Sequence, residues 1–222
     1  MHTDHNNQQP GHRRVGALLL IRNLEGDVLL VKPSYRTHWQ LVGGGVRSNE
    51  LVPHAALREG IEETGLSDLE VGDLLVVDHI AANPDSGAVE GLNFVFDGGM
   101  LPGNAPITLP DPAPGEEPEL TDWKFVSGNQ LRHYCNPVQH RRICEALAAL
   151  ADPSQRAYLA EGQPVTPYPN PSAPDRSSPH TPLRLPFPRG LACRVRAALR
   201  ARRHGISTNF MAIAFTRKPN GE

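Results

Sequence analysis

The chain has 222 residues, of which 39% are hydrophobic, and a formal net charge of −2 at pH 7. This length supplies one domain of ordinary size plus an extension, and the composition excludes fibrous proteins. Apolar runs such as Ala17 to Ile21 are far too short to cross a bilayer, and residues 1–14 lack the apolar core of a signal peptide. We therefore expect a cytoplasmic protein with no transmembrane segment.

The first elements in chain order are two apolar runs, residues 15–22 and 28–32, separated by Asn-Leu-Glu-Gly-Asp at 23–27. Apolar runs joined by a short loop with Gly and Asp are typical of a β-hairpin. A further short run, residues 39–42, leads into three consecutive glycines.

Residues 51–64 are expected to form a helix. Glu59, Glu62 and Glu63 would then fall at i, i+3 and i+4 on one face. Like charges this close raise one another's pKa, and a hard cation with oxygen ligands relieves the repulsion. When such a triplet occurs without other signals, it is usually a solvated acidic face.

Glycines frame this helix on both sides. Gly43, Gly44 and Gly45 lie upstream, where missing side chains allow the backbone to approach a ligand closely, and Gly65 lies downstream as a left-handed helix stop. The framed unit favours a magnesium site over a solvated acidic face.

Further strands are expected at residues 69–80, 92–97 and 120–126, followed by a helix over 137–151. Strands and helices that alternate irregularly in this way favour a mixed sheet with helices on its faces.

The chain changes character after Asp152, because residues 164–188 are rich in proline and serine. We expect four parts, which are a flexible N-terminal arm (1–12), a folded domain (13–152), a disordered linker (153–188) and a basic tail (189–222) in which residues 190–204 could form a short helix.

Charge divides the chain unevenly. Residues 1–150 hold 11 Lys and Arg against 20 Asp and Glu, a net charge of −9, whereas residues 151–222 hold 11 against 4, a net charge of +7. A basic tail could contact nucleic acid or an anionic surface. We favour a solvated extension, because no aromatic residues are interleaved with the arginines as in nucleic-acid-binding segments.

Cys135, Cys144 and Cys193 lack the C-x-x-C spacing of zinc sites and are odd in number. They indicate ordinary reduced thiols rather than a disulfide framework.

The segment from Gly44 to Leu66 reads G-x5-E-x7-R-E-G-x-E-E-x-G-L. It resembles the Nudix box, G-x5-E-x7-R-E-U-x-E-E-x-G-U with U aliphatic, at eight of nine specified positions. Gly60 departs where the pattern has an aliphatic residue, which affects local packing rather than chemistry, and we expect Ile61 to compensate by packing nearby. Upstream, Val42 stands where the family commonly has proline.

The resemblance covers about residues 13–150 and implies an α/β/α sandwich with a mixed sheet, in which the box helix borders the catalytic cleft. It implies a pyrophosphohydrolase that acts on acid anhydrides. The substrate would be a nucleoside diphosphate linked to another moiety X, and the products a nucleoside monophosphate and phospho-X.

The family assigns roles to the charged residues of the box. Glu59, Glu62 and Glu63 would be ligands of Mg²⁺, with Mn²⁺ as a substitute, and Glu50 a supporting carboxylate at the same site. Arg58 would orient the carboxylates by ion pairing.

The candidate substrate-binding residues are Gly43, Gly44 and Gly45, which would shape a loop beneath the carboxylates, and Trp39, whose ring could stack a base. Packing is the other interpretation of Trp39, and Trp123 is open to the same two interpretations.

The general base has three candidates, because members of this family differ in where they carry it. Glu59 ranks first, followed by Glu117 or Glu119 in the loop before the strand at 120–126. Acidic loop residues are more often simply solvated.

Alternatives stay open at this point. The substrate could be a nucleotide sugar such as ADP-ribose or a noncanonical nucleoside triphosphate, and the chain could be a monomer or a homodimer. A different class is a Nudix-like nucleotide sensor that does not catalyse and whose basic tail contacts nucleic acid. Isomerase chemistry on an isoprenoid diphosphate is less favoured, because it would need a cysteine or acid near the cleft, and Cys135 and Cys144 lie far along the chain.

Overall fold

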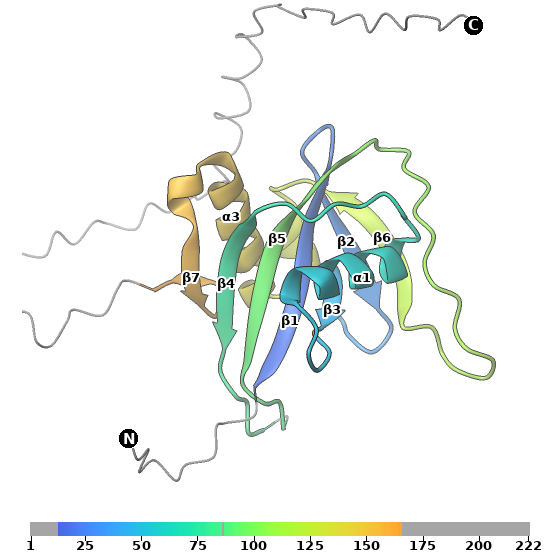
Figure 1. The fold of residues 1–222 in the computed structure, drawn as a ribbon, viewed down its shortest axis with the longest axis horizontal. Helices are drawn as coiled ribbons and strands as arrows, with labels where there is room; N and C mark the ends of the chain where they lie inside the picture. Colours follow the sequence, from blue (N-terminus) through green and yellow to red (C-terminus); the bar gives the residue numbers. More distant parts are fainter. Residues whose placement is uncertain (1–12, 86, 166–222) are drawn as a thin grey trace, which may run out of the picture.

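Eight strands form one mixed sheet in the order β6-β2-β3-β1-β5-β4-β7-β8 (Figure 1). The computed structural model of the chain describes residues 13–85 and 87–165. Its strands are β1 (Arg14–Asn23), β2 (Val28–Pro33), β3 (Gln40–Gly45), β4 (Leu74–Ile80), β5 (Gly91–Leu101), β6 (Leu120–Val126), β7 (Ala157–Ala160) and β8 (Gln163–Pro164). Its helices are α1 (Val52–Thr64), α2 (Leu131–Tyr134), α3 (Pro137–Ala151) and the 3₁₀ turn η1 (Pro153–Gln155).

Strand β1 lies at the centre of the sheet. It pairs in parallel with β5, so that Val15 faces Leu92 and Leu19 faces Phe96, and antiparallel with β3 on its other side. The other parallel pair joins β4 and β7. A sheet with both kinds of pairing has long connections that cross its faces, and these connections contain the helices.

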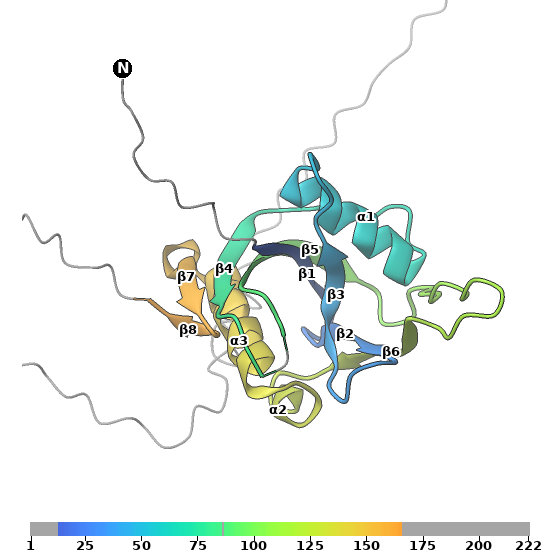
Figure 2. The same cartoon turned by 90° about the horizontal axis from the view of Figure 1, so that it is seen from below.

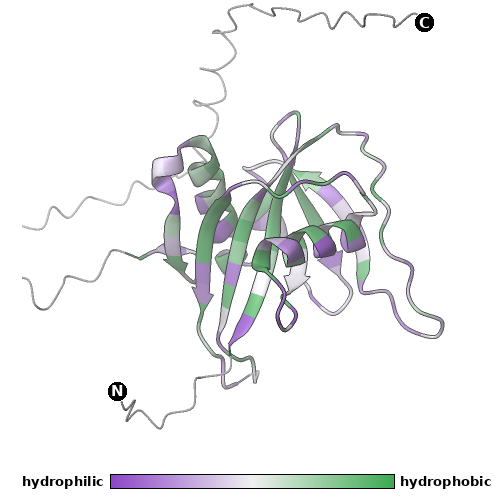
Figure 3. Cartoon of the chain, in the orientation of Figure 1, coloured by the Kyte–Doolittle hydropathy of each residue, from purple (hydrophilic) through white to green (hydrophobic). Residues whose placement is uncertain are grey.

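The side chains of β1 alternate between two apolar cores. Leu19 and Ile21 pack with α1, while Leu20 packs with residues of α3. Helix α1 therefore covers one face of the curved sheet and α3 the other (Figure 2). Figure 3 shows apolar residues along the central strands where both faces are covered. The expected α/β/α sandwich with a mixed sheet is confirmed.

The expected hairpin forms between β1 and β2. Its loop is closed by the N–H of Asn23, which donates to the carbonyl of Asp27 at 2.9 Å. The side-chain oxygen of Asn23 accepts from the N–H groups of Glu25 and Asp27, and Gly26 takes a positive φ of 86°. The turn is held by local bonds, which explains why its sequence is informative.

The glycine run does not form the expected loop. Gly43, Gly44 and Gly45 are the second half of β3 and pair with Leu18, Ala17 and Gly16 of β1. The family resemblance implied a loop, but here the strand needs the missing side chains for close approach.

Two element boundaries also differ from the expectation. The strand expected at 69–80 begins only at Leu74, and Leu69 instead packs under α1. The linker expected from residue 153 is wrong in its first part, because residues 153–165 form η1, β7 and β8 at the edge of the sheet. Leu159 of β7 is fully buried, which explains why this segment is ordered.

The expected arm at 1–12 and the basic tail at 189–222 lie outside the described residues. In the part of the chain that the structure describes, none of the helices is both long and apolar enough to span a membrane.

Candidate functional site

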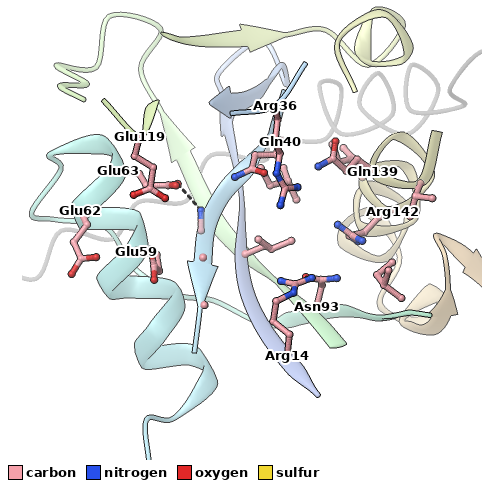
Figure 4. Close-up of a pocket in the computed structure, with 18 of the residues that line it drawn as sticks. Arg14, Arg36, Gln40, Glu59, Glu62, Glu63, Asn93, Glu119, Gln139 and Arg142 are labelled. Carbon is pink, nitrogen blue, oxygen red and sulfur yellow. Dashed lines mark hydrogen bonds between the residues drawn. The ribbon is translucent and has the colours of Figure 1, made fainter. Parts of the chain in front are cut away.

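Helix α1 positions the carboxylates predicted from the box. Pro53 lies in its first turn, where a missing N–H costs nothing, and Gly65 ends it in a left-handed conformation with φ of 70°. The N–H of Gly65 donates to the carbonyl of Ile61 at 2.9 Å. Between these ends, α1 carries Glu59 and Glu63 toward β3, and Glu62 lies farther from that strand (Figure 4).

Arg58 connects the acidic residues to one another. Its Nε donates to Glu50 at 2.8 Å, and its Nη1 donates to Glu59 at 2.7 Å and to Glu62 at 3.1 Å. Its Nη2 donates to the carbonyl of Gly45 at 3.0 Å. One guanidinium therefore holds three carboxylates and the end of β3 in fixed relation.

These contacts change the pKa values of the partners. The Arg58 side chain, followed by the backbone N–H of Arg47, lowers the pKa of Glu50 to about 2. The bond to Glu50 raises the pKa of Arg58 above its ordinary value, against the effect of burial. Glu50 is therefore ionised at neutral pH, with its charge matched by Arg58.

Glu63 lies in a different environment from its neighbours. Only 8% of it is exposed, and its Oε2 accepts a bond of 2.7 Å from the N–H of Gly43. Burial is the main cause that raises the pKa of Glu63 to about 8, and the charges of Glu59, Glu119 and Glu62 add to it. A cation placed beside these carboxylates would reverse this effect.

The glycines of β3 create the space for these carboxylates. A Cβ on Gly44 would lie 2.5 Å from Oε2 of Glu59, and a Cβ on Gly43 would lie 2.2 Å from the carbonyl oxygen of Ala17. Gly43 also has a φ of +129°, whereas a Cβ on Gly45 would meet nothing within 4 Å. Gly43 is thus required by the backbone, and Gly44 by the Glu59 side chain.

The departure of Gly60 from the box is compensated in a way that the sequence did not predict. Ile61, the expected substitute, is 37% exposed. The space above Gly60 is instead taken by Leu19 and Leu69, whose Cδ1 atoms would lie 2.7 and 3.1 Å from a Cβ at this position. The aliphatic anchor is therefore supplied from β1 and from the loop after α1.

The loop acids differ in their placement. Glu119 lies directly before β6 and lines the cleft near Glu63, as Figure 4 shows. Glu117 is exposed and is not among the residues that line the cleft. The structure thus brings Glu119 to the carboxylates of α1 and leaves Glu117 outside.

Trp39 does not line the cleft. Its ring packs edge-to-face against Tyr134, with centroids 5.8 Å apart, and Nζ of Lys124 lies 5.1 Å from its ring centroid. Trp123 packs in the same manner against Phe125. Both rings are engaged within the fold.

A cleft of about 660 Å³ opens between α1 and α3, across β1 and β3. Its lining divides into two sides (Figure 4). We call one side the acidic wall, which consists of Glu59, Glu62, Glu63 and Glu119. We call the other the arginine wall, which consists of Arg14, Arg36 and Arg142.

The arginine wall was not predicted from the sequence. Its members come from β1, from the loop between β2 and β3, and from α3, so no local motif joins them. One signal was present, because Asp78 interrupts the apolar strand β4. Asp78 is fully buried and accepts from Nε of Arg142 at 2.7 Å and from the N–H of Gly162 at 2.9 Å. A buried acid of this kind requires a cation nearby.

The acidic wall has the chemistry of a divalent-metal site, because Mg²⁺ prefers carboxylate oxygens. As the side chains stand, residues 13–85 and 87–165 contain no group of three His, Cys, Asp or Glu close enough to hold an ion. Arg58 occupies oxygens of Glu59 and Glu62, and the N–H of Gly43 occupies one of Glu63. The carboxylates fit the ion as ligands. The ion would compete with the N–H groups of Arg58 and Gly43 for the same oxygens.

The described cysteines lie away from this chemistry. Cys135 is buried, and burial raises the pKa of its thiol to about 12. Neither Cys135 nor Cys144 lines the cleft. Cys193 lies outside the described residues.

Comparisons with known proteins bear on both the fold and the box. The family model described as NUDIX domain matches residues 12–147. No curated protein matches the chain.

Solved structures show similar folds. A UDP-X diphosphatase is 20% identical, with 70% of this chain and 70% of that chain covered and a TM-score of 0.50. The MutT protein from Methanosarcina mazei Go1 is 24% identical, with 61% and 93% covered and a TM-score of 0.49. A NUDIX hydrolase from Nitrosomonas europaea is 20% identical, with 71% and 98% covered and a TM-score of 0.48.

Proposed function

The chain belongs to the NUDIX family, and from this premise we propose that it is a magnesium-dependent pyrophosphohydrolase. It cleaves the phosphoanhydride of a nucleoside diphosphate that is linked to another moiety. One observation carries the proposal, which is that Glu59, Glu62 and Glu63 line a cleft beside Glu119, with Gly44 keeping the space that Glu59 occupies.

In this proposal, Glu59, Glu62 and Glu63 hold the metal, and Glu50 supports them through Arg58. A divalent ion bound there would supply Lewis-acid chemistry, which neutralises phosphate charge and acidifies a water molecule. Arg58 keeps the carboxylates oriented, because its guanidinium bonds Glu50 and Glu59 at the same time. Mn²⁺ has similar ligand preferences and is expected to substitute.

The general base takes up the proton of the attacking water. We rank Glu59 first, because it lines the cleft and only one of its oxygens accepts from Arg58. Glu119 ranks second, since it lines the cleft as well. Glu117 ranks last, since it lies outside the lining.

The substrate could be a nucleotide sugar or a noncanonical nucleoside triphosphate. A UDP-X diphosphatase is among the proteins with a similar fold, which is consistent with the first class. Hydrolysis is favoured over nucleotide sensing, because all the charged residues of the box are present.

The test is a substrate panel with the full chain. ADP-ribose, UDP-glucose and noncanonical nucleoside triphosphates are incubated with Mg²⁺ or Mn²⁺, and monophosphate products are measured after phosphatase coupling. We expect Glu62→Gln to lower turnover about a hundredfold or more. Losing a metal ligand should cost more activity than losing a residue that only supports a ligand, which typically costs about 10-fold to 100-fold. The fold should persist, since the Glu62 side chain is 50% exposed.

The matched control is Glu116→Gln, which removes an exposed acid outside the cleft and should leave turnover unchanged. Full activity in Glu62→Gln would rule out the metal assignment. Nucleotide binding without turnover across the panel would instead support the sensor.

A further inference from the structure

The cleft carries positive charge that the hydrolysis of one phosphoanhydride does not require. The acidic wall and its metal are sufficient to hold a pyrophosphate group. Opposite that wall, Arg14, Arg36 and Arg142 line the same cleft, and none of the described acidic residues lines their side (Figure 4). Three like charges that converge from three segments repel one another, and an anion between them would remove that repulsion.

In the part of the chain that the structure describes, two of the three arginines have no carboxylate partner. Among residues 13–85 and 87–165, no carboxylate forms an ion pair with Arg14 or Arg36. Nη2 of Arg14 reaches only the amide oxygen of Asn93, at 3.5 Å, and Arg36 lies over the ring of Tyr35 at 5.4 Å. Both guanidinium groups therefore keep donors for a ligand.

Arg142 is held in place by a buried acid of strand β4. Its Nε donates to the buried Asp78, and it is the only side-chain donor of Arg142 with a partner in the described residues. The pair leaves the Nη groups for the cleft, and Asp78 is fixed in turn by the N–H of Gly162. Arg142 is 7% exposed, so that its position is set by the fold rather than by solvent.

The surroundings also give this wall room and polar neighbours. A Cβ on Gly16 would lie 2.6 Å from Oδ1 of Asn93, so a glycine is what lets Asn93 reach Arg14. Gln139, which lines the cleft beside Arg142, has a buried Oε1 that accepts no hydrogen bond in the described part of the chain. Partial burial and then the charges of Arg36 and Arg142 lower the pKa of Arg14, which agrees with a desolvated cluster.

We propose that the arginine wall binds a second phosphate group of the substrate, a phosphomonoester on the part of the molecule that lies away from the scissile phosphoanhydride. Two uncompensated guanidinium charges match a phosphomonoester, which carries about −1.5 to −2 at pH 7, better than a carboxylate with −1. Guanidinium groups also bind phosphate bidentately. A cleft of about 660 Å³ lies within the range of about 300–1,000 Å³ for small-molecule sites.

This inference names a substrate class for the proposed function and rests on it, so its first test does not require turnover. Inorganic phosphate is titrated into the full chain in EDTA, and its dissociation constant is obtained from ³¹P line broadening. We expect Arg14→Gln to weaken binding about tenfold. Arg13→Gln, the neighbouring arginine, which pairs with Glu90 and does not line the cleft, should not weaken it.

The second test compares substrates that differ by one phosphate. With Mg²⁺, kcat/KM is measured for ADP-ribose against 2′-phospho-ADP-ribose and for dephospho-coenzyme A against coenzyme A, with UDP-glucuronate against UDP-glucose as the carboxylate arm. We expect kcat/KM to be at least tenfold higher for a phosphorylated member than for its unphosphorylated partner. This ratio should fall toward one in Arg14→Gln but not in Arg13→Gln.

The outcomes separate the two claims. Phosphate binding that depends on Arg14, in a chain that cleaves nothing in the panel, supports the arginine wall and counts against the proposed function. Equal phosphate binding by wild type and Arg14→Gln overturns the arginine wall, whatever the chain hydrolyses. Equal kcat/KM for the members of each pair that differ by one phosphate would overturn it as well.

Discussion

The two walls of the cleft are built in opposite ways. The acidic wall comes mainly from one helix, and its supports, Arg58 and Gly44, lie within the same stretch of sequence. The arginine wall joins residues separated by up to 128 positions, from Arg14 to Arg142, and depends on Asp78 and Gly162 to hold it. The first wall can therefore be predicted from a motif, whereas the second exists only in the folded chain.

The largest expected effect comes from removing the distant support of the arginine wall. A chain that ends at Asp152 lacks β7, including the fully buried Leu159, and lacks the N–H of Gly162 that Asp78 accepts. Asp78 and Arg142 would then be left in an incomplete core, and we expect a loss of several kcal/mol of stability or failure to fold. Urea denaturation followed by circular dichroism measures the change.

The matched control ends at Val165 and keeps both strands. It should unfold at the same urea concentration as the full chain. Equal stability of the two truncated chains would contradict the view that residues 153–165 support the wall.

The next effect tests the local support of the acidic wall. In Gly44→Ala, the new Cβ would lie 2.5 Å from Oε2 of Glu59 and should push this flexible carboxylate aside. We expect kcat/KM to fall about 10-fold to 100-fold, the range for disturbed support of metal ligands, while the melting temperature changes little. Steady-state kinetics with Mg²⁺ measure the loss.

Gly45→Ala is the paired control, because its Cβ would meet nothing within 4 Å. It should retain the activity of wild type. Equal losses in the two variants would mean that the glycines act through strand β3 as a whole rather than through Glu59.

The smallest effect concerns the position where the box departs from its pattern. Gly60→Ala should gain about 1 kcal/mol of helix propensity but lose about 1–3 kcal/mol through overpacking against Leu19, for a net loss of about 1 kcal/mol. Leu19→Val removes the Cδ1 atom that lies 2.7 Å from the new Cβ, so Gly60→Ala should cost less in that background. Urea denaturation of the four chains measures the coupling. A more stable Gly60→Ala would contradict the packing explanation.

These cases indicate what the sequence could and could not predict. Helices α1 and α3 were predicted to within one residue, because proline, glycine and apolar periodicity mark their ends locally. The family resemblance implied that the glycines of β3 shape a loop, and their place in a strand could not be predicted because the close approach to Ala17 is a tertiary contact. Strands β7 and β8 are short and were missed for the same reason, since β7 is held by β4, 81 residues earlier at Val76 and Ala157.

Within the cleft, the sequence predicted the charged residues of the box through their match to the family pattern, and the structure gathers them along α1. The compensation at Gly60 was not, because Leu19 and Leu69 reach it only through the fold. Glu119 could not be separated from Glu117 in the sequence, since both are acids in one loop, and only the cleft distinguishes them. For the arginine wall, the sequence contains a single indication, which is the acid Asp78 within an apolar strand.

The most direct test of the central claim follows the oxygen of the attacking water. The full chain and Mg²⁺ are incubated in H₂¹⁸O with whichever nucleoside diphosphate derivative the panel identifies, and both products are analysed by mass spectrometry. Hydrolysis of a phosphoanhydride predicts one ¹⁸O atom in one of the two phosphate-bearing products, at a rate that depends on Mg²⁺ and falls about a hundredfold or more in Glu62→Gln. Products without ¹⁸O on phosphorus, or labelled product that forms as fast in Glu62→Gln as in the wild type, would contradict it.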